Sequence, residues 1–205
     1  MCSPDSLEAL VIGELVTEGI ICSMDDLSEI IIDEDLHLAK VLLKNKDKEN
    51  LTDGHKENLT DDNKDIADDY HMTIKAKEEL IDKDIILAIF QSFVSASDLF
   101  KSTGGVHSCA IVKGNEVLYH QDDISRQNAI NKVIGLCYQH NLFIGDELLL
   151  TSCRISSEIM KKVIHSGIRI IISKSAPTDV AIELAKKNGM ILYGFARGQT
   201  MNRYS

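Results

Sequence analysis

The alternation of helical and apolar segments in the second half of the chain constrains its fold most strongly. Apolar residues at helical spacing alternate with short runs rich in Ile, Leu and Val, which is typical of helices and strands in turn. The expected elements, beginning with a helix, cover residues 126–141, 147–151, 156–165, 169–173, 178–188 and 190–195. Short helices between apolar strands predict a mainly parallel sheet with right-handed crossovers, and hence an α/β layer domain over residues 80–205.

Two further elements precede this alternation and belong to the same domain. Residues 106–112 and 116–120 flank the turn Lys113–Gly114–Asn115, so we expect a β-hairpin there. An apolar segment over residues 84–100 predicts a helix that ends before the paired glycines at positions 104 and 105.

The first 79 residues differ from the rest in composition. Residues 1–43 predict one helix and two short strands, which form only a small, partial α+β unit. Residues 44–79 indicate a charged, mobile insert or linker, because half of residues 44–71 are charged and the six residues 48–53 recur as 56–61. So few apolar groups do not offset the entropy of ordering such a segment. The alternative interpretation is an acidic, solvated face.

Composition argues against several classes of protein. The chain of 205 residues has 22 Lys and Arg against 32 Asp and Glu, a formal net charge of −10. Nucleic acid and anionic membranes attract a surplus of Lys and Arg, so neither is an expected partner. The longest strictly apolar run, residues 85–90, is far shorter than the roughly 18 residues of a membrane-spanning helix. Five widely spaced cysteines without a C-x-x-C, and no secretory signal, predict a cytoplasmic protein.

Polar loops follow the carboxyl ends of three expected strands, where sheets of this kind bind ligands. The loops and their cations are residues 151–157 with Arg154, 173–178 with Lys174, and 196–200 with Arg197. Two of these loops lead into helix N-termini, where free backbone N–H groups favour an anion. A phosphorylated or nucleotide-like ligand is therefore expected. The alternative is that Ser156 and Thr178 only cap their helices.

The segment between the expected helix and hairpin is a fourth candidate feature. Gly104 and Gly105 allow positive φ angles and a close approach of the backbone to a ligand, and His107 follows as an acid/base or contact residue. The alternative is that the glycines terminate the helix and that His107 is a hydrogen-bonded core residue.

Cys153 is the candidate catalytic residue. It lies in a strand-to-helix loop beside Arg154, and such an environment lowers the pKa of a thiol. Convergence of His107, Cys109 and Cys153 would resemble a metal site. However, the C-x-x-C of structural zinc sites and the H-x-E and P-C-x-x-C of zinc deaminases are missing, so we expect no metal. Cys137 lies on the apolar face of a helix and is expected to be a buried hydrophobic residue.

Six sequence motifs occur in a fixed order along the chain. They are Cys2–Ser3–Pro4–Asp5 continuing to Glu18–Gly19–Ile20–Ile21, Thr103–Gly104–Gly105–Val106–His107, Asp122–Asp123–Ile124–Ser125–Arg126–Gln127–Asn128–Ala129, Arg154–Ile155–Ser156–Ser157–Glu158, Ser175–Ala176–Pro177–Thr178 and Gly194–Phe195–Ala196–Arg197–Gly198. In this order they resemble the FdhD/NarQ family of formate dehydrogenase accessory proteins. The resemblance covers nearly all of the chain except about residues 44–80.

The resemblance implies a fold, a partner set and an activity. The fold is a cytidine-deaminase-like sheet sandwiched between helices, and members are homodimers. Members receive sulfur from a cysteine desulfurase and pass it to the molybdenum bis(molybdopterin guanine dinucleotide) cofactor before that enters formate dehydrogenase. Together with the polar loops, the resemblance predicts that the cofactor-binding residues are Phe195, Ala196, Arg197, Gly198, Gln199, Thr200, Arg154, Ser156, Gly104, Gly105 and His107.

The chain also departs from the family pattern. The family carries the mobile sulfur on a C-x-x-C loop, expected where residues 44–79 lie, and this sequence has none. Asn131 stands where the family has Asp, and the family's first strands have no counterpart before Cys2. The chain therefore resembles a shortened, divergent member. Three interpretations stay open: a sulfur-transferring accessory protein, a non-catalytic cofactor- or nucleotide-binding protein that has lost the sulfur carrier, and an enzyme acting on a nucleotide.

Overall fold

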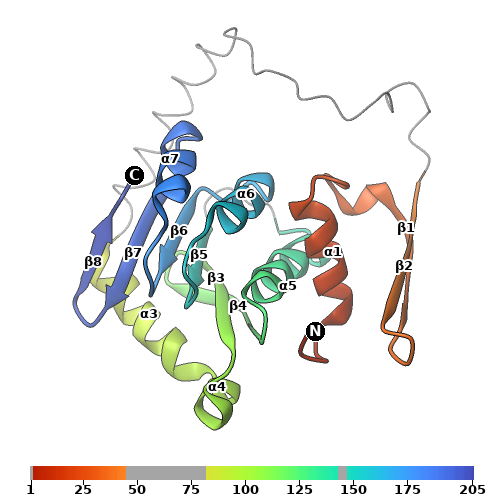
Figure 1. The fold of residues 1–205 in the computed structure, drawn as a ribbon, viewed down its shortest axis with the longest axis horizontal. Helices are drawn as coiled ribbons and strands as arrows, with labels where there is room; N and C mark the ends of the chain where they lie inside the picture. The colour runs from red at the N-terminus through yellow and green to blue at the C-terminus, as the bar shows by residue number, and fades with distance from the viewer. Residues whose placement is uncertain (1, 45–81, 143–146) are drawn as a thin grey trace, which may run out of the picture.

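The computed structural model describes residues 2–44, 82–142 and 147–205. Its central element is a six-stranded sheet with the strand order β4-β3-β5-β6-β7-β8 (Figure 1). The strands are β3 (His107–Lys113), β4 (Glu116–Asp123), β5 (Leu148–Thr151), β6 (Ile170–Ser173), β7 (Ile191–Arg197) and β8 (Thr200–Arg203). A separate antiparallel ribbon consists of β1 (Leu27–Asp33) and β2 (Leu38–Leu43). The helices are α1 (Leu7–Thr17), α3 (Lys83–Ala96), α4 (Asp98–Thr103), α5 (Arg126–Gln139), α6 (Ser157–His165) and α7 (Asp179–Lys187), with a 3₁₀ turn, η1, at Met24–Asp26.

The sheet is mixed rather than mainly parallel. Strands β5, β6 and β7 are parallel neighbours, whereas β3 pairs antiparallel with both β4 and β5. Strand β8, which the sequence did not predict, pairs antiparallel with β7. The turn between them contains Gly198, whose φ of 54° is a left-handed conformation that glycine adopts easily. A tight turn joins only antiparallel strands, so the hairpins at both edges make the sheet mixed.

Both faces of the sheet are covered, which confirms the predicted three-layer α/β class. Along β3, Cys109 and Ile111 belong to the hydrophobic cluster that includes α1, α5, α6 and α7, while Ala110 and Val112 belong to the cluster that includes α3. Successive side chains of a strand point to opposite faces, so a strand that is apolar at every position must be buried on both. The continuous apolar runs of the sequence therefore predicted the layers.

The single helix expected over residues 84–100 is interrupted at Ser97. The Ser97 hydroxyl accepts a hydrogen bond of 2.9 Å from the Phe100 N–H and donates one of 2.6 Å to Asp122 Oδ2. Serine competes in this way with the helical hydrogen-bond pattern, so α3 ends and the short helix α4 begins in a new direction (Figure 1).

Helix α1 approaches α5 to backbone contact. A Cβ atom on Gly13 would lie 1.8 Å from the carbonyl oxygen of Asn131, and one on Gly135 would lie 1.8 Å from that of Ala9. Only glycine fits at both positions. Helix α1 also contributes apolar residues to the cluster on the sheet face. It therefore shares the core of the sheet, while the division of the chain at residues 43 and 80 stays a prediction.

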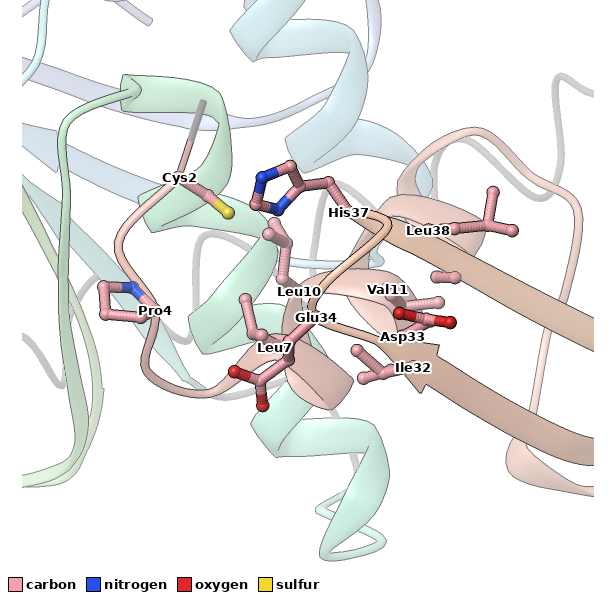
Figure 2. A pocket seen from close by; sticks show the side chains of 11 residues that line it. Cys2, Pro4, Leu7, Leu10, Val11, Ile32, Asp33, Glu34, His37 and Leu38 are labelled. Carbon is pink, nitrogen blue, oxygen red and sulfur yellow. The ribbon is translucent and has the colours of Figure 1, made fainter.

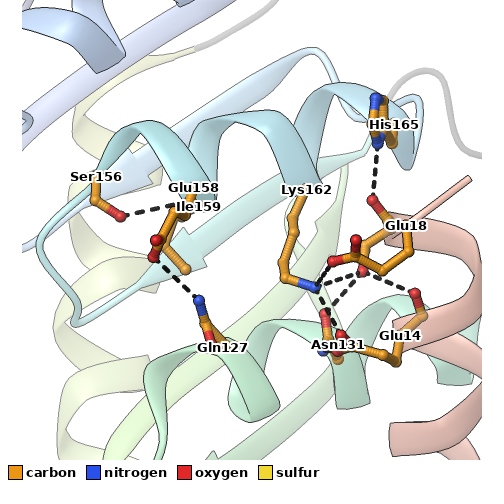
Figure 3. Close-up of polar contacts among 10 residues, drawn as sticks. Glu14, Glu18, Gln127, Asn131, Ser156, Glu158, Ile159, Lys162 and His165 are labelled. Carbon is orange, nitrogen blue, oxygen red and sulfur yellow. Dashed lines mark hydrogen bonds and ion pairs between the residues drawn. The ribbon is translucent and has the colours of Figure 1, made fainter. Parts of the chain in front are cut away.

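A buried lysine of α6 holds the C-terminal end of α1 (Figure 3). The Lys162 ammonium donates a hydrogen bond of 3.1 Å to Thr17 Oγ1 and lies 2.7 Å from Glu18 and 3.2 Å from Glu14. Its hydrogen bond to Glu18 holds the pKa of that carboxyl below the ordinary value. Asn131 of α5 donates to Glu14 as well, so three helices share one polar cluster.

A second buried lysine holds the segment before α1. Lys132 of α5 lies 2.9 Å from Asp123 and donates a hydrogen bond of 3.1 Å to the Ser3 carbonyl. The Ser3 N–H in turn donates to Asp123 at 2.9 Å. Burial alone would raise the pKa of Asp123, but hydrogen bonds from the Ser125 backbone, Lys132 and Ser3 hold it below its ordinary value. The N-terminal segment thus completes the pairing of a buried charge.

Two expectations concern the rest of the chain. Residues 45–81, which include most of the predicted insert at 44–79, lie outside the described residues, so the mobile insert stays a prediction. Within the described ranges, no helix combines the length and the apolar character that crossing a membrane requires.

The backbone contact between α1 and α5 predicts that one methyl group added at this contact strongly lowers the stability of the protein. We expect Gly135→Ala to lower the free energy of unfolding by about 3 kcal/mol, because the added Cβ meets backbone that does not move independently of its helix. Urea denaturation measures the change. Gly105→Ala is the control, because the nearest atom to its Cβ would lie at 3.8 Å. Equal stability of the two variants would contradict the backbone contact.

Candidate functional site

The ends of β5 and β6 and the start of β3 meet at one edge of the sheet. The Lys174 N–H donates a hydrogen bond of 2.9 Å to the Thr151 carbonyl, and the Ser152 N–H donates one of 2.9 Å to the Ser108 carbonyl. A further backbone bridge joins Ile155 to the second of the predicted polar loops. Two of the three predicted loops therefore lie side by side, next to the first residues of β3.

A pocket with a volume of about 430 Å³ opens at this edge. Glycine and serine residues, one aromatic ring and one lysine line most of it. The lining residues are Val94, Phe100, Gly104, Gly105, Val106, His107, Ser108, Ser152, Lys174 and Ser175. Three of the predicted binding residues thus line one pocket, which we call the strand-end pocket.

One wall of the strand-end pocket combines a cation with an aromatic face. The Lys174 ammonium lies 6.0 Å from the centroid of the Phe100 ring, which is 42% exposed. Gly104 has a φ of 63°, and a Cβ there would meet nothing within 4 Å, so its backbone is open to a ligand. An aromatic face suits a nucleobase and an ammonium suits a phosphate. Sequence reasoning did not select Phe100.

Arg154 and Ser156 lie outside the strand-end pocket. Arg154 is exposed in the loop after β5. Ser156 caps α6 by accepting a hydrogen bond from the Ile159 N–H, and Thr178 caps α7 by accepting one from the Ala181 N–H. Capping therefore accounts for the conformation of both hydroxyl residues.

The predicted binding stretch at residues 195–200 is a hairpin rather than a loop that follows a strand. Phe195, Ala196 and Arg197 belong to β7, Gly198 and Gln199 form the turn, and Thr200 begins β8. The Phe195 N–H donates a hydrogen bond of 3.2 Å to the Ser175 carbonyl, so the hairpin borders the strand-end pocket. The Arg197 guanidinium lies 5.4 Å from the Phe195 ring centroid and does not line the pocket.

Three side chains with reactive chemistry meet beside the strand-end pocket, and we call them the thiol cluster: His107, Cys109 and Cys153. Cys153 is hydrogen-bonded to both of the others. Thr151 contacts both cysteines, because its Oγ1 accepts a hydrogen bond of 3.2 Å from the Cys109 thiol and one of 3.1 Å from the Cys153 N–H. Both cysteines are buried and free, and His107 alone of the cluster lines the pocket.

The pairing of the strands explains why these residues meet. His107 and Cys109 are two positions apart on β3 and therefore point to the same face of the sheet. Cys109 lies opposite Thr151 in the β3–β5 ladder, and Cys153 follows Thr151 by two residues. The spacing of His107 and Cys109 can be read from the sequence. The register of β3 against β5, which brings Cys153 beside them, cannot.

The surroundings of the thiol cluster shift the pKa values of all three of its members. Hydrogen bonds from Cys109 first, then from His107 and Thr151, outweigh burial and lower the pKa of Cys153 to about 5. Burial raises the pKa of Cys109 well above its ordinary value, and the hydrogen bond to Cys153 adds to this. The same contact with Cys153 raises the pKa of His107. The cluster therefore favours the thiolate form of Cys153 and the protonated forms of Cys109 and His107.

No group of three or more His, Cys, Asp or Glu side chains in the described ranges is arranged to hold a metal ion.

A second pocket, of about 310 Å³, lies between α1 and the β1–β2 ribbon (Figure 2). Leu7, Leu10 and Val11 line it from the helix, and Ile32 and Leu38 line it from the ribbon. None of the predicted binding residues lines this apolar pocket.

The fold and the site define a class: a three-layer α/β protein whose sheet edge carries a polar pocket beside a paired thiol. The model of the FdhD/NarQ family matches residues 1–205. The chain therefore belongs to the FdhD/NarQ family, as its six motifs predicted.

Individual relatives agree with this assignment. The sulfur carrier protein FdhD of Bacillus licheniformis is 36% identical over 100% of this chain and 80% of its own length. The protein of the same name from Staphylococcus aureus is 35% identical with the same coverage. The crystal structure of a Desulfotalea psychrophila protein, described as a formate dehydrogenase accessory protein, matches with a TM-score of 0.75 and 21% identity, over 100% of this chain and 80% of that one. This likeness confirms the fold.

The thiol cluster predicts an acid titration of one cysteine. Because its folded-state pKa is depressed, the Cys153 thiolate persists at neutral pH and is protonated as the pH falls through about 5. The ultraviolet absorbance of the thiolate reports this step. We expect Cys153→Ser to abolish it and His107→Ala to shift it to higher pH.

Cys137→Ser is the matched control. Burial raises the pKa of Cys137 to about 12, so this residue contributes no thiolate at neutral pH. A titration step near pH 5 that survives Cys153→Ser would contradict the assignment.

Proposed function

We propose that this protein is an accessory protein of formate dehydrogenase maturation. It binds the molybdenum bis(molybdopterin guanine dinucleotide) cofactor as a substrate at the strand-end pocket and passes sulfur to it. The sulfur donor is a cysteine desulfurase, and the recipient of the finished cofactor is a formate dehydrogenase. The protein acts in the cytoplasm as a homodimer.

The observation that carries this proposal is the position of the thiol cluster beside the strand-end pocket. His107 lines the pocket and is hydrogen-bonded to Cys153, so one residue contacts both the ligand space and the reactive sulfur. Sulfur transfer requires a nucleophilic thiolate close to the acceptor, and the lowered pKa of Cys153 provides the thiolate. The names of the relatives, which call them sulfur carriers, support the same chemistry.

The lining of the strand-end pocket supports a guanine dinucleotide as the ligand. Phe100 offers a face on which a base stacks, and Lys174 offers a charge-assisted hydrogen bond to a phosphate. Gly104 and Gly105 leave the backbone of the lining open to a ligand. The hairpin with Arg197 borders the pocket, and in this proposal it contacts the part of a large cofactor that extends beyond the pocket.

A second candidate function is binding of the same ligand without sulfur transfer. Cys153 is only 1% exposed, and no C-x-x-C is present to carry sulfur on a mobile loop. Both functions share the strand-end pocket and differ only in the chemistry of the thiol cluster.

Guanine nucleotide binding tests the pocket. We expect GDP to bind the wild-type protein and Lys174→Ala to weaken binding about tenfold or more, because a charge-assisted hydrogen bond to phosphate contributes roughly 1.5–3 kcal/mol. Arg197→Ala is expected to weaken it as well, as the family resemblance predicts. Calorimetry measures both.

Lys186→Ala provides the control, because Lys186 is an exposed cation of α7 that does not line the pocket. Equal affinity for the wild type and both site variants would exclude guanine nucleotide binding by these cations.

A further inference from the structure

The thiol cluster contains two cysteines, and a carrier of sulfur needs only one. Cys109 and Cys153 come from different elements, yet both contact Thr151 Oγ1: Cys109 Sγ lies 3.2 Å from it, and the Cys153 N–H donates to it at 3.1 Å. Both are almost fully buried, with exposures of 0% and 1%. A disulfide joins two sulfur atoms at about 2.05 Å, so it requires cysteines that are neighbours in the fold, as these two are.

The two thiols differ in the role that their environment allows. The contacts of Cys153 with Cys109 and His107 stabilise its anionic form. The thiolate is the attacking species in sulfur chemistry, so Cys153 reacts first. Cys109 is fully buried beside Thr151 and does not line the pocket, so its nearest reaction partner is the sulfur of Cys153.

We propose that Cys153 and Cys109 form a sulfur-release pair, in which Cys153 takes the terminal sulfur of a persulfide and Cys109 then displaces that sulfur as hydrosulfide into the strand-end pocket. This inference rests on the proposed function and supplies its chemical mechanism. It assigns the second thiol a role that a single-cysteine carrier lacks.

The first step moves one sulfur atom. The Cys153 thiolate attacks the terminal sulfur of a donor persulfide, R–S–SH. The S–S bond of the donor breaks, a new S–S bond forms at Cys153 Sγ, and the donor leaves as the thiolate R–S⁻. The persulfide on Cys153 loses its proton, which the donor thiolate takes up as R–SH. His107, hydrogen-bonded to Cys153, balances the negative charge of the persulfide anion.

The second step releases the sulfur. Cys109 attacks Cys153 Sγ, the S–S bond of the persulfide breaks, and a disulfide forms between the two cysteines. The proton of Cys109 passes to the leaving sulfur, which departs as HS⁻. The transferred sulfur gains two electrons, and the two cysteine thiols together lose them. A dithiol reductant then restores both thiols and is itself oxidised to a disulfide.

The strand-end pocket is the space into which hydrosulfide leaves. His107 lines the pocket and interacts with Cys153, and the adjoining lining is formed by the small residues Ser108 and Ser152. Lys174 supplies a positive charge that favours an anion.

Persulfide chemistry with purified protein tests the pair. The reduced wild-type protein is treated with glutathione persulfide, and released sulfide and cysteine modifications are measured by a sulfide probe and by mass spectrometry. We expect about one equivalent of sulfide per chain and a disulfide between Cys109 and Cys153. Cys109→Ser should retain a persulfide on Cys153 and release about tenfold less sulfide, because the displacing thiol is absent. Cys153→Ser should do neither.

Cys137→Ser is the matched control, because it removes a buried cysteine that lies outside the thiol cluster. It should behave as the wild type does. Melting temperatures establish that each variant is folded, and the disulfide in the wild-type protein tests the pair without any substitution.

The possible failures are distinguishable. A stable persulfide on Cys153 of the wild type, with no disulfide to Cys109 and no sulfide, would overturn the release pair and leave sulfur transfer by Cys153 in place. No persulfide on Cys153 in folded Cys109→Ser would overturn both the pair and the sulfur-transfer part of the proposed function. In that case only ligand binding by the strand-end pocket would remain.

Discussion

The backbone contact between α1 and α5 is the constraint on which the rest of the structure depends. Glycine at positions 13 and 135 lets the two helices touch, and this closeness encloses Lys132 and Lys162 between elements that must supply their carboxylate partners. The Lys132–Asp123 pair is fully buried, and removing one partner of such a pair costs about 3–5 kcal/mol, so the position of α5 on the sheet is specified by charge as well as by shape. Helix α5 in turn covers β3, the strand that carries His107 and Cys109, two of the three members of the thiol cluster.

The direction of β3 decides the character of the site. In an all-parallel sheet only the carboxyl ends of strands and the loops after them would meet at this edge. Because β3 runs antiparallel to β5, its first residue, His107, lies at the same edge as the ends of β5 and β6. Strand β3 thereby brings a histidine and a buried cysteine to the polar pocket. The parallel strands alone would leave Cys153 without these two partners.

The departures from the family pattern have structural counterparts. Asn131, where the family has Asp, donates a hydrogen bond to Glu14 in a cluster that already contains Glu18, and a third carboxylate there could not donate it. The missing C-x-x-C concerns a mobile carrier, whereas Cys109 and Cys153 are fixed in the core. A buried pair protects a reactive sulfur from solvent and other thiols, but it restricts the donors that reach it. The protein thus has two buried thiols beside the strand-end pocket and no C-x-x-C.

The sequence by itself determined the layered α/β class, the strands and helices of the second half, and two of the polar loops at the sheet edge. These follow from local periodicity, because a strand that is apolar at every position is buried on both faces and a Ser or Thr before a helix caps it. The pairing of β7 with β8, the break at Ser97 and the meeting of Cys153 with Cys109 were decided only by the tertiary structure. They depend on strand register and on contacts between residues far apart in the chain, and neither leaves a local pattern in the sequence.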